Sequence, residues 1–226
     1  SPLYLRRNDV RQSKSRSRAA LTRPTGRGLL GPDGDQGAGV SEYAAQAAQA
    51  AADIGAATGR VDPAALAGLV QEIAAARQIV LQGAGREGLM MRGLAMRLAH
   101  LGCRVHMAGD MATPPVGPGD LLLVSSGPGA LASIAALIRV AKAAGARTAC
   151  VTAQPDGPDP VACDRVLVIP AQTMADDRGA AASQVLPMGS LFEGAQFLTF
   201  ELLVLALRNH LGETAETMRA RHTNLE

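Results

Sequence analysis

The chain has 226 residues, of which 47% are apolar and only 2% aromatic, and its formal net charge is +2. This length suits one domain with a sizeable core, which Ala, Leu and Val must fill because aromatic side chains are so few. The three cysteines include no C-x-x-C pair, which argues against a disulfide framework or a zinc site and predicts a reducing, cytoplasmic location. We find no apolar run of about 18 residues and expect no membrane span.

The positive charge is concentrated at the N-terminus. The first 40 residues hold eight Arg or Lys and three Asp, so the rest of the chain has a net charge of −3. Residues 1–40 are rich in Arg, Gly, Ser and Pro, contain no secretory h-region, and are predicted to form a disordered basic extension. An Arg-rich arm can bind nucleic acid, but no aromatic residue is interleaved with these charges, so we expect no such partner. The predicted folded domain covers residues 41–226.

The domain opens with two predicted helices, residues 41–59 and 62–77. Asp62 is a typical N-cap and Pro63 a typical first helical residue. Short apolar segments then alternate with segments of helical period. The predicted strands are 78–82, 104–108, 120–125, 147–152 and 165–169, and the further helices are 87–101, 131–144 and 190–210. This alternation predicts a three-layer, doubly wound α/β fold with a five-stranded parallel sheet. Ligands of such sheets bind beyond the carboxyl ends of the strands.

The turn after the first predicted strand, residues 83–88, reads GAGREG. Its G-x-G-x-x-G spacing is a weak indication of dinucleotide binding, because the acidic residue expected about 20 residues further on is matched only in part by Asp110. Arg86 favours a phosphate or a sugar hydroxyl, since a guanidinium presents a fork of donors. The glycines also suit an ordinary tight turn. We expect no redox cofactor.

A second turn, residues 125–133, reads SSGPGALAS and opens a predicted helix. Small residues at a helix N-terminus expose backbone N–H groups, and the helix dipole favours an anion there, which predicts a phosphate cradle. The Lys-Ser/Thr ending of a P-loop is missing, which argues against ATP hydrolysis. An ordinary capped turn is the alternative. The candidate phosphate-binding residues of this turn are Ser125, Ser126, Gly127, Gly129 and Ser133.

A third turn, residues 186–193, reads LPMGSLFE and precedes the last long helix. Ser190 stands where an N-cap is expected, and Glu193 follows at the spacing of a capping box. Two interpretations are open: Glu193 caps the helix, or it is a carboxylate at the mouth of a site and serves as a general base. Desolvation would raise the pKa of Glu193, whereas the helix N-terminus would lower it.

These turns, together with other segments, resemble the SIS (sugar isomerase) family, and within it the 6-phospho-3-hexuloisomerase group. The resemblance covers residues 41–226 and rests on GAGR (83–86), AMRLAHLG (95–102), GD (109–110), TP (113–114), LPMGSLFE (186–193) and RHTNLE (221–226). It implies a flavodoxin-like sheet, a homo-oligomer that is commonly a tetramer, no metal and no cofactor. The implied reaction interconverts a 3-hexulose 6-phosphate and fructose 6-phosphate.

Such an isomerisation needs a base, a proton shuttle and an anchor for the substrate. We assign the base to Glu193 and the shuttle or ring opening to His222, which would reach the site of a neighbouring subunit. Gly85, Arg86 and Thr113 join the cradle residues as substrate-binding candidates. His100 and His106 are interpreted as packing residues.

One segment departs from the family pattern. The family's phosphate turn usually reads SGSGET, whereas residues 126–131 read SGPGAL. Pro128 and Leu131 replace two hydroxyls, and Pro128 also removes an N–H group. Hydrogen bonds to a charged group are worth about 1.5–3 kcal/mol each, so the grip on phosphate weakens unless Ser125, Ser133 or Arg86 compensates.

Two other functions stay open. A non-catalytic sugar-phosphate sensor is the alternative from another class, although the helix-turn-helix that usually precedes it has no counterpart in residues 1–40. An isomerase for a different phosphosugar, such as arabinose 5-phosphate, is the second, although its usual C-terminal pair of small domains has no room here.

Overall fold

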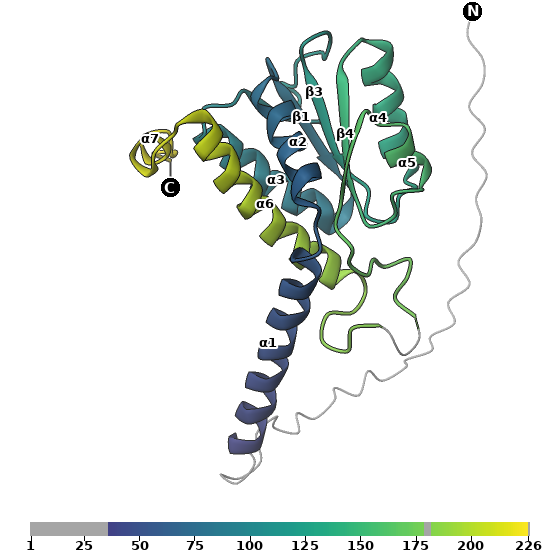
Figure 1. Cartoon of the computed structure of the whole chain (residues 1–226), viewed down its shortest axis with the longest axis vertical. Helices are drawn as coiled ribbons and strands as arrows, with labels where there is room; N and C mark the ends of the chain where they lie inside the picture. The colour runs from purple at the N-terminus through teal and green to yellow at the C-terminus, as the bar shows by residue number, and fades with distance from the viewer. Residues whose placement is uncertain (1–35, 179–181, 226) are drawn as a thin grey trace, which may run out of the picture. The chain divides into compact units, whose positions relative to one another are not determined.

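The computed structural model describes residues 36–178 and 182–225 (Figure 1). The chain divides into two units, residues 1–41 and 42–226. The basic extension predicted for residues 1–40 lies, up to residue 35, outside the described residues. Helix α1 (Gln36–Thr58) begins at Gln36 rather than at the predicted residue 41.

The second unit is built on one parallel sheet. Its strands are β1 (Ile79–Gly83), β2 (Val105–Met107), β3 (Leu121–Ser125), β4 (Arg147–Thr152) and β5 (Arg165–Val168), in the order β2-β1-β3-β4-β5. In register, Leu81 lies opposite Met107 on one side and Leu123 on the other. The predicted five-stranded, flavodoxin-like sheet is confirmed. The strand order reverses between β1 and β3, and this switch point is where ligands of such sheets bind.

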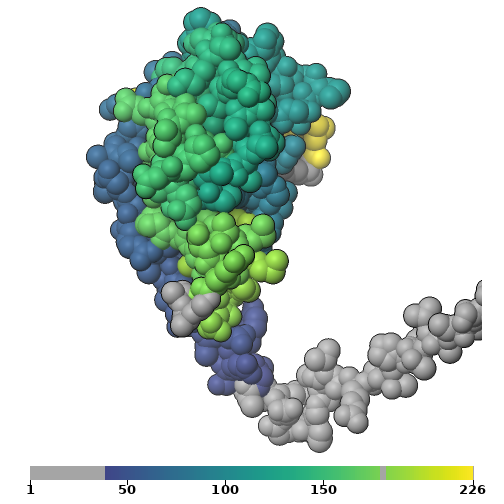
Figure 2. All heavy atoms as spheres, turned by 90° about the vertical axis from the view of Figure 1, so that its right-hand side faces the viewer, coloured from purple at the N-terminus to yellow at the C-terminus, as the bar shows by residue number. Residues whose placement is uncertain are grey.

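Helices cover both faces of the sheet, as predicted. One face carries α2 (Pro63–Ala74), α3 (Gly85–His100) and α6 (Ser190–Leu211), while α4 (Ala132–Ala143) and α5 (Pro158–Val161) lie on the other (Figure 1). Figure 2 looks onto the side of α4 and α5, whose teal and green atoms face the viewer. The two faces divide the strand side chains alternately, as the pleat requires. Leu81 and Leu123 pack in the core under α3 and α6, whereas Val80 and Leu122 pack against α4. A short last helix, α7 (Ala215–Ala220), was not predicted.

The second helix begins as the sequence predicts. Asp62 is its N-cap and accepts a hydrogen bond from the backbone N–H of Ala64 at 2.9 Å. Pro63 occupies the first helical position, where its missing N–H is not needed. This helix packs on the same face of the sheet as α6, and its buried side chains Leu69, Val70 and Ile73 join the larger core.

Helix α6 is long and apolar enough to cross a membrane by length and composition, although Glu193 and Glu201 interrupt its apolar residues. In this fold it is a core helix, and such helices pass the same test. Phe192, Phe200 and Leu203 are at most 3% exposed and join the larger core. The face of α6 that packs on the sheet also buries polar side chains, among them Gln196.

The G-x-G-x-x-G motif serves a close approach of β1 and α3. A Cβ on Gly88 would lie only 2.6 Å from the carbonyl oxygen of Gly83, and Gly85 has a positive φ of +54°. Asp110, the partial match to a ribose-binding acid, is half-exposed and pairs with Arg92 at 3.6 Å. The contacts of this motif are therefore those of a tight strand-to-helix turn.

Candidate functional site

Three turns meet at the switch point of the sheet, and Arg86 joins two of them. Its guanidinium Nη1 donates to Ser190 Oγ at 2.9 Å, and its Nη2 donates to the carbonyl oxygen of Met188. Nη2 also lies 3.0 Å from Glu193 Oε2. Arg86, in the first turn of α3, therefore fastens the turn that precedes α6 and places a positive charge beside Glu193.

Glu193 lies at this junction with 17% of its side chain exposed. Burial raises the pKa of its carboxyl, the Arg86 charge lowers it, and the nearby Glu87 charge raises it, so that the net pKa lies above the ordinary glutamate value. Glu193 Oε2 is ion-paired with Arg86 but makes no hydrogen bond within the described residues. A partly buried carboxylate with a raised proton affinity is suited to general-base chemistry.

The predicted capping box is not formed. The N-cap of α6 is Gly189 with φ +84°, no side chain caps the helix, and Ser190 is already its first residue. Met188 also has a positive φ, of +55°, which is rare for a residue with a side chain. Its N–H donates to Asp177 and its carbonyl oxygen accepts from Arg86. The turn is thus held from both sides, and the capping interpretation of Glu193 is not supported.

Glu87, for which no role was predicted, lies inside the predicted phosphate cradle. Its Oε2 accepts hydrogen bonds from Ser125 Oγ at 2.5 Å and from the Gly127 N–H at 2.9 Å. The buried Gln196 donates to Ser125 Oγ at 2.8 Å and so completes a chain of donors that ends on Glu87. Burial raises the pKa of Glu87, whereas the hydrogen bonds from Ser125 and Gly127 lower it. The net pKa lies above the ordinary glutamate value.

Two other hydrogen-bond donors of the cradle are bound by a second carboxylate. Asp159, which is 1% exposed, accepts from Ser126 Oγ at 2.6 Å and from the Leu131 N–H at 2.7 Å. The Gly129 N–H donates to the Ser126 carbonyl oxygen at 2.9 Å. The Ser126 hydroxyl is therefore directed toward α5, whereas the hydroxyl of its neighbour Ser125 is directed toward Glu87.

Two more candidates lie apart from this junction. Ser133 is exposed in the first turn of α4, the helix that covers the opposite face of the sheet. Thr113 Oγ1 donates to the Met107 carbonyl oxygen at 2.6 Å, so its hydroxyl fixes the loop after β2. Neither makes a hydrogen bond or ion pair with Arg86, Glu87 or Glu193.

His222 lies at the other end of α3. Its ring stacks on that of His100, the last residue of α3, with centroids 5.1 Å apart. At 1.5 Å per residue, about 22 Å of helix separates His100 from Gly85. Arg221 holds this tail in place by donating to the His100 carbonyl oxygen and pairing with Glu213. Within one chain, His222 is not brought to Glu193.

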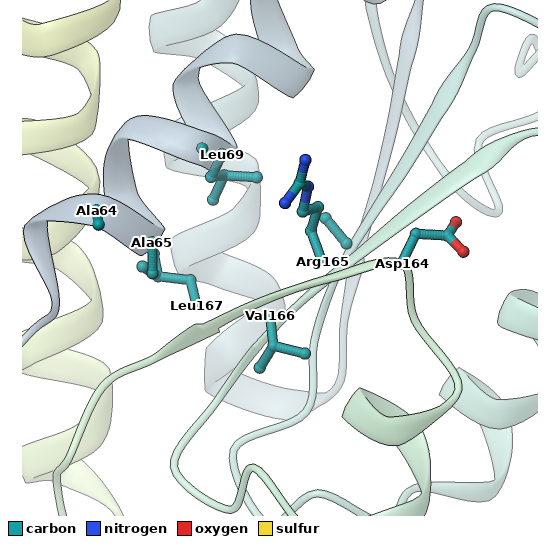
Figure 3. Close-up of a pocket in the computed structure, with 9 residues that line it drawn as sticks. Ala64, Ala65, Leu69, Asp164, Arg165, Val166 and Leu167 are labelled. Carbon is teal, nitrogen blue, oxygen red and sulfur yellow. The ribbon is translucent and has the colours of Figure 1, made fainter.

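A separate hollow of about 360 Å³ lies between α2 and β5 (Figure 3). Its charged groups are engaged in structural pairs: Arg165 with Glu72 at 3.1 Å, and Asp164 with Lys142 at 3.1 Å. It therefore offers little to an anionic ligand. Within residues 36–178 and 182–225, no group of three or more His, Cys, Asp or Glu is placed to hold a metal ion.

Comparison with known proteins assigns this architecture. The SIS domain family model matches residues 72–220. A protein of Mycobacterium gastri named 3-hexulose-6-phosphate isomerase is 41% identical over 74% of this chain and 83% of its own length. A Bacillus subtilis protein of the same name is 35% identical over 70% of this chain and 85% of its own length. The structure of a Methanococcus jannaschii protein, from which a 3-hexulose-6-phosphate isomerase function was inferred, has a TM-score of 0.64 and 27% identity, covering 72% of this chain and 86% of that one.

The matched region contains β1 to β5 and α3 to α7, and with them every residue of the junction between Arg86, Glu87, Ser125 and Glu193. The chain therefore belongs to the SIS domain family and groups there with proteins named 3-hexulose-6-phosphate isomerase.

Proposed function

We propose that this protein is a phosphosugar isomerase that interconverts a 3-hexulose 6-phosphate and fructose 6-phosphate. The observation that carries the proposal is the 41% identity to the Mycobacterium gastri isomerase over 83% of that protein. The site supports the same chemistry, because a partly buried carboxylate stands beside a guanidinium at the switch point of the sheet. A cytoplasmic location, predicted from the cysteine usage, is part of this proposal.

The reaction moves a carbonyl group between neighbouring carbons. To go from fructose 6-phosphate to the 3-hexulose, a base removes the hydrogen of C3, an enediol forms across C2 and C3, and a proton is delivered to C2. We assign the base to Glu193, whose raised pKa favours accepting a proton from carbon. Arg86, next to that carboxylate, would stabilise the negative charge that develops on the enediol oxygens.

The phosphate needs an anchor near this pair. We propose the Ser125 hydroxyl, the Gly127 N–H and the guanidinium of Arg86 as its main donors, with the backbone of Gly85 and Gly129 at the edge of the same turns. Thr113 is not proposed to contact the substrate, because its hydroxyl donates to the Met107 carbonyl oxygen. It shapes the loop after β2 instead. Ser126 and Ser133 are left out because of where their side chains lie.

The direct test is conversion. We expect the purified protein to convert fructose 6-phosphate labelled with ¹³C at C3 into a mixture that contains 3-hexulose 6-phosphate, followed by NMR as the labelled C3 becomes a carbonyl carbon. Appearance of an aldose instead would show an isomerase of different specificity. Tight binding of fructose 6-phosphate without any conversion would contradict the proposal and favour the sugar-phosphate sensor.

We further propose that the protein assembles into a homotetramer in which a second copy supplies His222. Large apolar side chains are exposed on neighbouring faces of α3 and α6, namely Leu89, Met96, Phe197 and Leu205. An apolar groove of about 170 Å³ runs between these two helices. Contiguous exposed apolar surface of this kind is typical of interfaces, and assembly offers a route for His222 to another active site.

Replacing Phe197, which is 57% exposed, by aspartate is expected to break the assembly. A charge placed in an apolar interface costs several kcal/mol when it is left unpaired (about 3 or more), so the mass measured by light scattering falls to that of smaller species and isomerase activity falls with it. Met111→Asp, at a fully exposed apolar residue of the loop after β2, is the matched control and leaves the mass unchanged. An unchanged mass for both variants would remove this surface from the assembly.

A further inference from the structure

The loop proposed to bind phosphate is already occupied by side chains of the protein. Glu87 Oε2 accepts hydrogen bonds from the Ser125 hydroxyl and the Gly127 N–H, while Asp159 accepts one from the Leu131 N–H. Pro128 has no N–H to offer. The donors that an anion would use in this loop are therefore engaged by two carboxylates of the same chain.

The loop is also closely packed against the Glu87 side chain. A Cβ on Gly127 would lie 2.8 Å from Glu87 Oε1 and 2.9 Å from the ring of Phe192, so the loop is packed against that carboxylate. The Phe192 ring is fully buried and cannot move aside without opening the core. A phosphate reaches Ser125 and Gly127 only when the Glu87 side chain leaves.

The charges at the junction also oppose phosphate binding while Glu87 is in the loop. The junction holds Glu87 and Glu193 against one guanidinium, that of Arg86, and a phosphate ester adds up to two more negative charges. Like charges in a partly buried site repel more strongly than they would in water. Rotation of Glu87 out of the loop, toward the solvent that its half-exposed neighbour Arg86 already meets, removes both the steric and the electrostatic conflict.

We propose that Glu87 is a specificity-determining residue of this site: its carboxylate competes with the phosphate group of the substrate for Ser125 Oγ and the Gly127 N–H, and it thereby keeps the affinity for phosphate esters low. The proposal rests on the proposed function for the identity of the ligand. Its consequence is that the enzyme binds phosphate only by displacing an internal anion, so substrate affinity is set by the balance between two acceptors for one pair of donors.

The test is phosphate binding by calorimetry, with inorganic phosphate as the probe. Glu87→Gln keeps the shape of the side chain but removes its charge, and a neutral acceptor holds the two donors about half as strongly. We expect this variant to bind phosphate at least about tenfold more tightly than the wild type. Glu42→Gln, the same change at an exposed residue of α1 whose partner is Gln46, is the matched control and binds like the wild type.

Two further arms make the result specific. Adding Ser125→Ala to Glu87→Gln is expected to remove most of the gain, because the phosphate then loses a donor. Unphosphorylated fructose is expected to bind the wild type and Glu87→Gln alike. If Glu87→Gln, folded by circular dichroism, binds phosphate no more tightly than the wild type, the proposal is overturned. Tighter phosphate binding by a protein that converts no fructose 6-phosphate would instead keep this inference and reject the proposed reaction.

Discussion

Glu193→Gln is expected to lower kcat for the isomerisation by about a thousandfold, the middle of the range for loss of a general base. The amide fills the same space but accepts no proton from carbon. Arg86 loses its ion pair but keeps its hydrogen bonds to Met188 and Ser190, so the turn before α6 should hold its shape. KM is expected to change little, since Glu193 is assigned to proton transfer and not to holding the phosphate.

Steady-state kinetics in both directions, with a urea unfolding curve for each variant, measures this effect. Glu42→Gln is again the control for a changed charge at a distance. A Glu193→Gln enzyme that folds normally and keeps more than about a tenth of the wild-type kcat would contradict the assignment of the base.

Gly88→Ala is expected to lower the free energy of unfolding by about 3 kcal/mol, at the upper end of the usual cost of overpacking. The new methyl group would lie 2.6 Å from the Gly83 carbonyl oxygen, a backbone atom that cannot rotate away. Helix α3 must then shift away from β1. Because Arg86 and Glu87 lie in the first turn of α3, activity is expected to fall with stability.

Urea unfolding compares this variant with Gly55→Ala, a helical glycine of α1 whose added Cβ would meet nothing within 4 Å. That control should be about 0.5–1 kcal/mol more stable than the wild type, because alanine has the higher helix propensity. Equal urea midpoints for Gly88→Ala and the wild type would show that the turn is not as tightly packed as described.

The fold could be predicted because its signals are local. Each of the five strands is a short apolar run, and the helices between them have a clear 3.6-residue period, so periodicity alone defined the layers. Helix α7 was missed because it is short and polar. It is held by a capping box between Thr214 and Thr217, which lies after the last apolar segment.

The directions of the side chains in the predicted phosphate cradle were not foreseen, although one signal in the sequence indicates them. Consecutive residues of a strand point to opposite faces of the sheet. Ser125 ends β3 and Ser126 follows it directly, so their hydroxyls were bound to diverge, one to Glu87 and the other to Asp159. Only one of the two could face the site.

Other features had no local signal. The partners of Glu87, namely Ser125 and Gly127, lie some 40 residues further on and meet it only through the β1–β3 pairing. The left-handed Met188 and Gly189, which displace the predicted N-cap from Ser190, depend on the reach of Arg86 across to another element. The place of His222 against His100 likewise depends on how the tail packs on α3.

The most direct measurement of the central claim, proton transfer by Glu193 between C2 and C3, is exchange of solvent deuterium into fructose 6-phosphate. The wild-type protein in D₂O should introduce deuterium at C3 and leave the C1 hydrogens untouched, as read by proton NMR, and Glu193→Gln should introduce none. Deuterium at C1, or undiminished exchange at C3 in the variant, would contradict the mechanism proposed for this site.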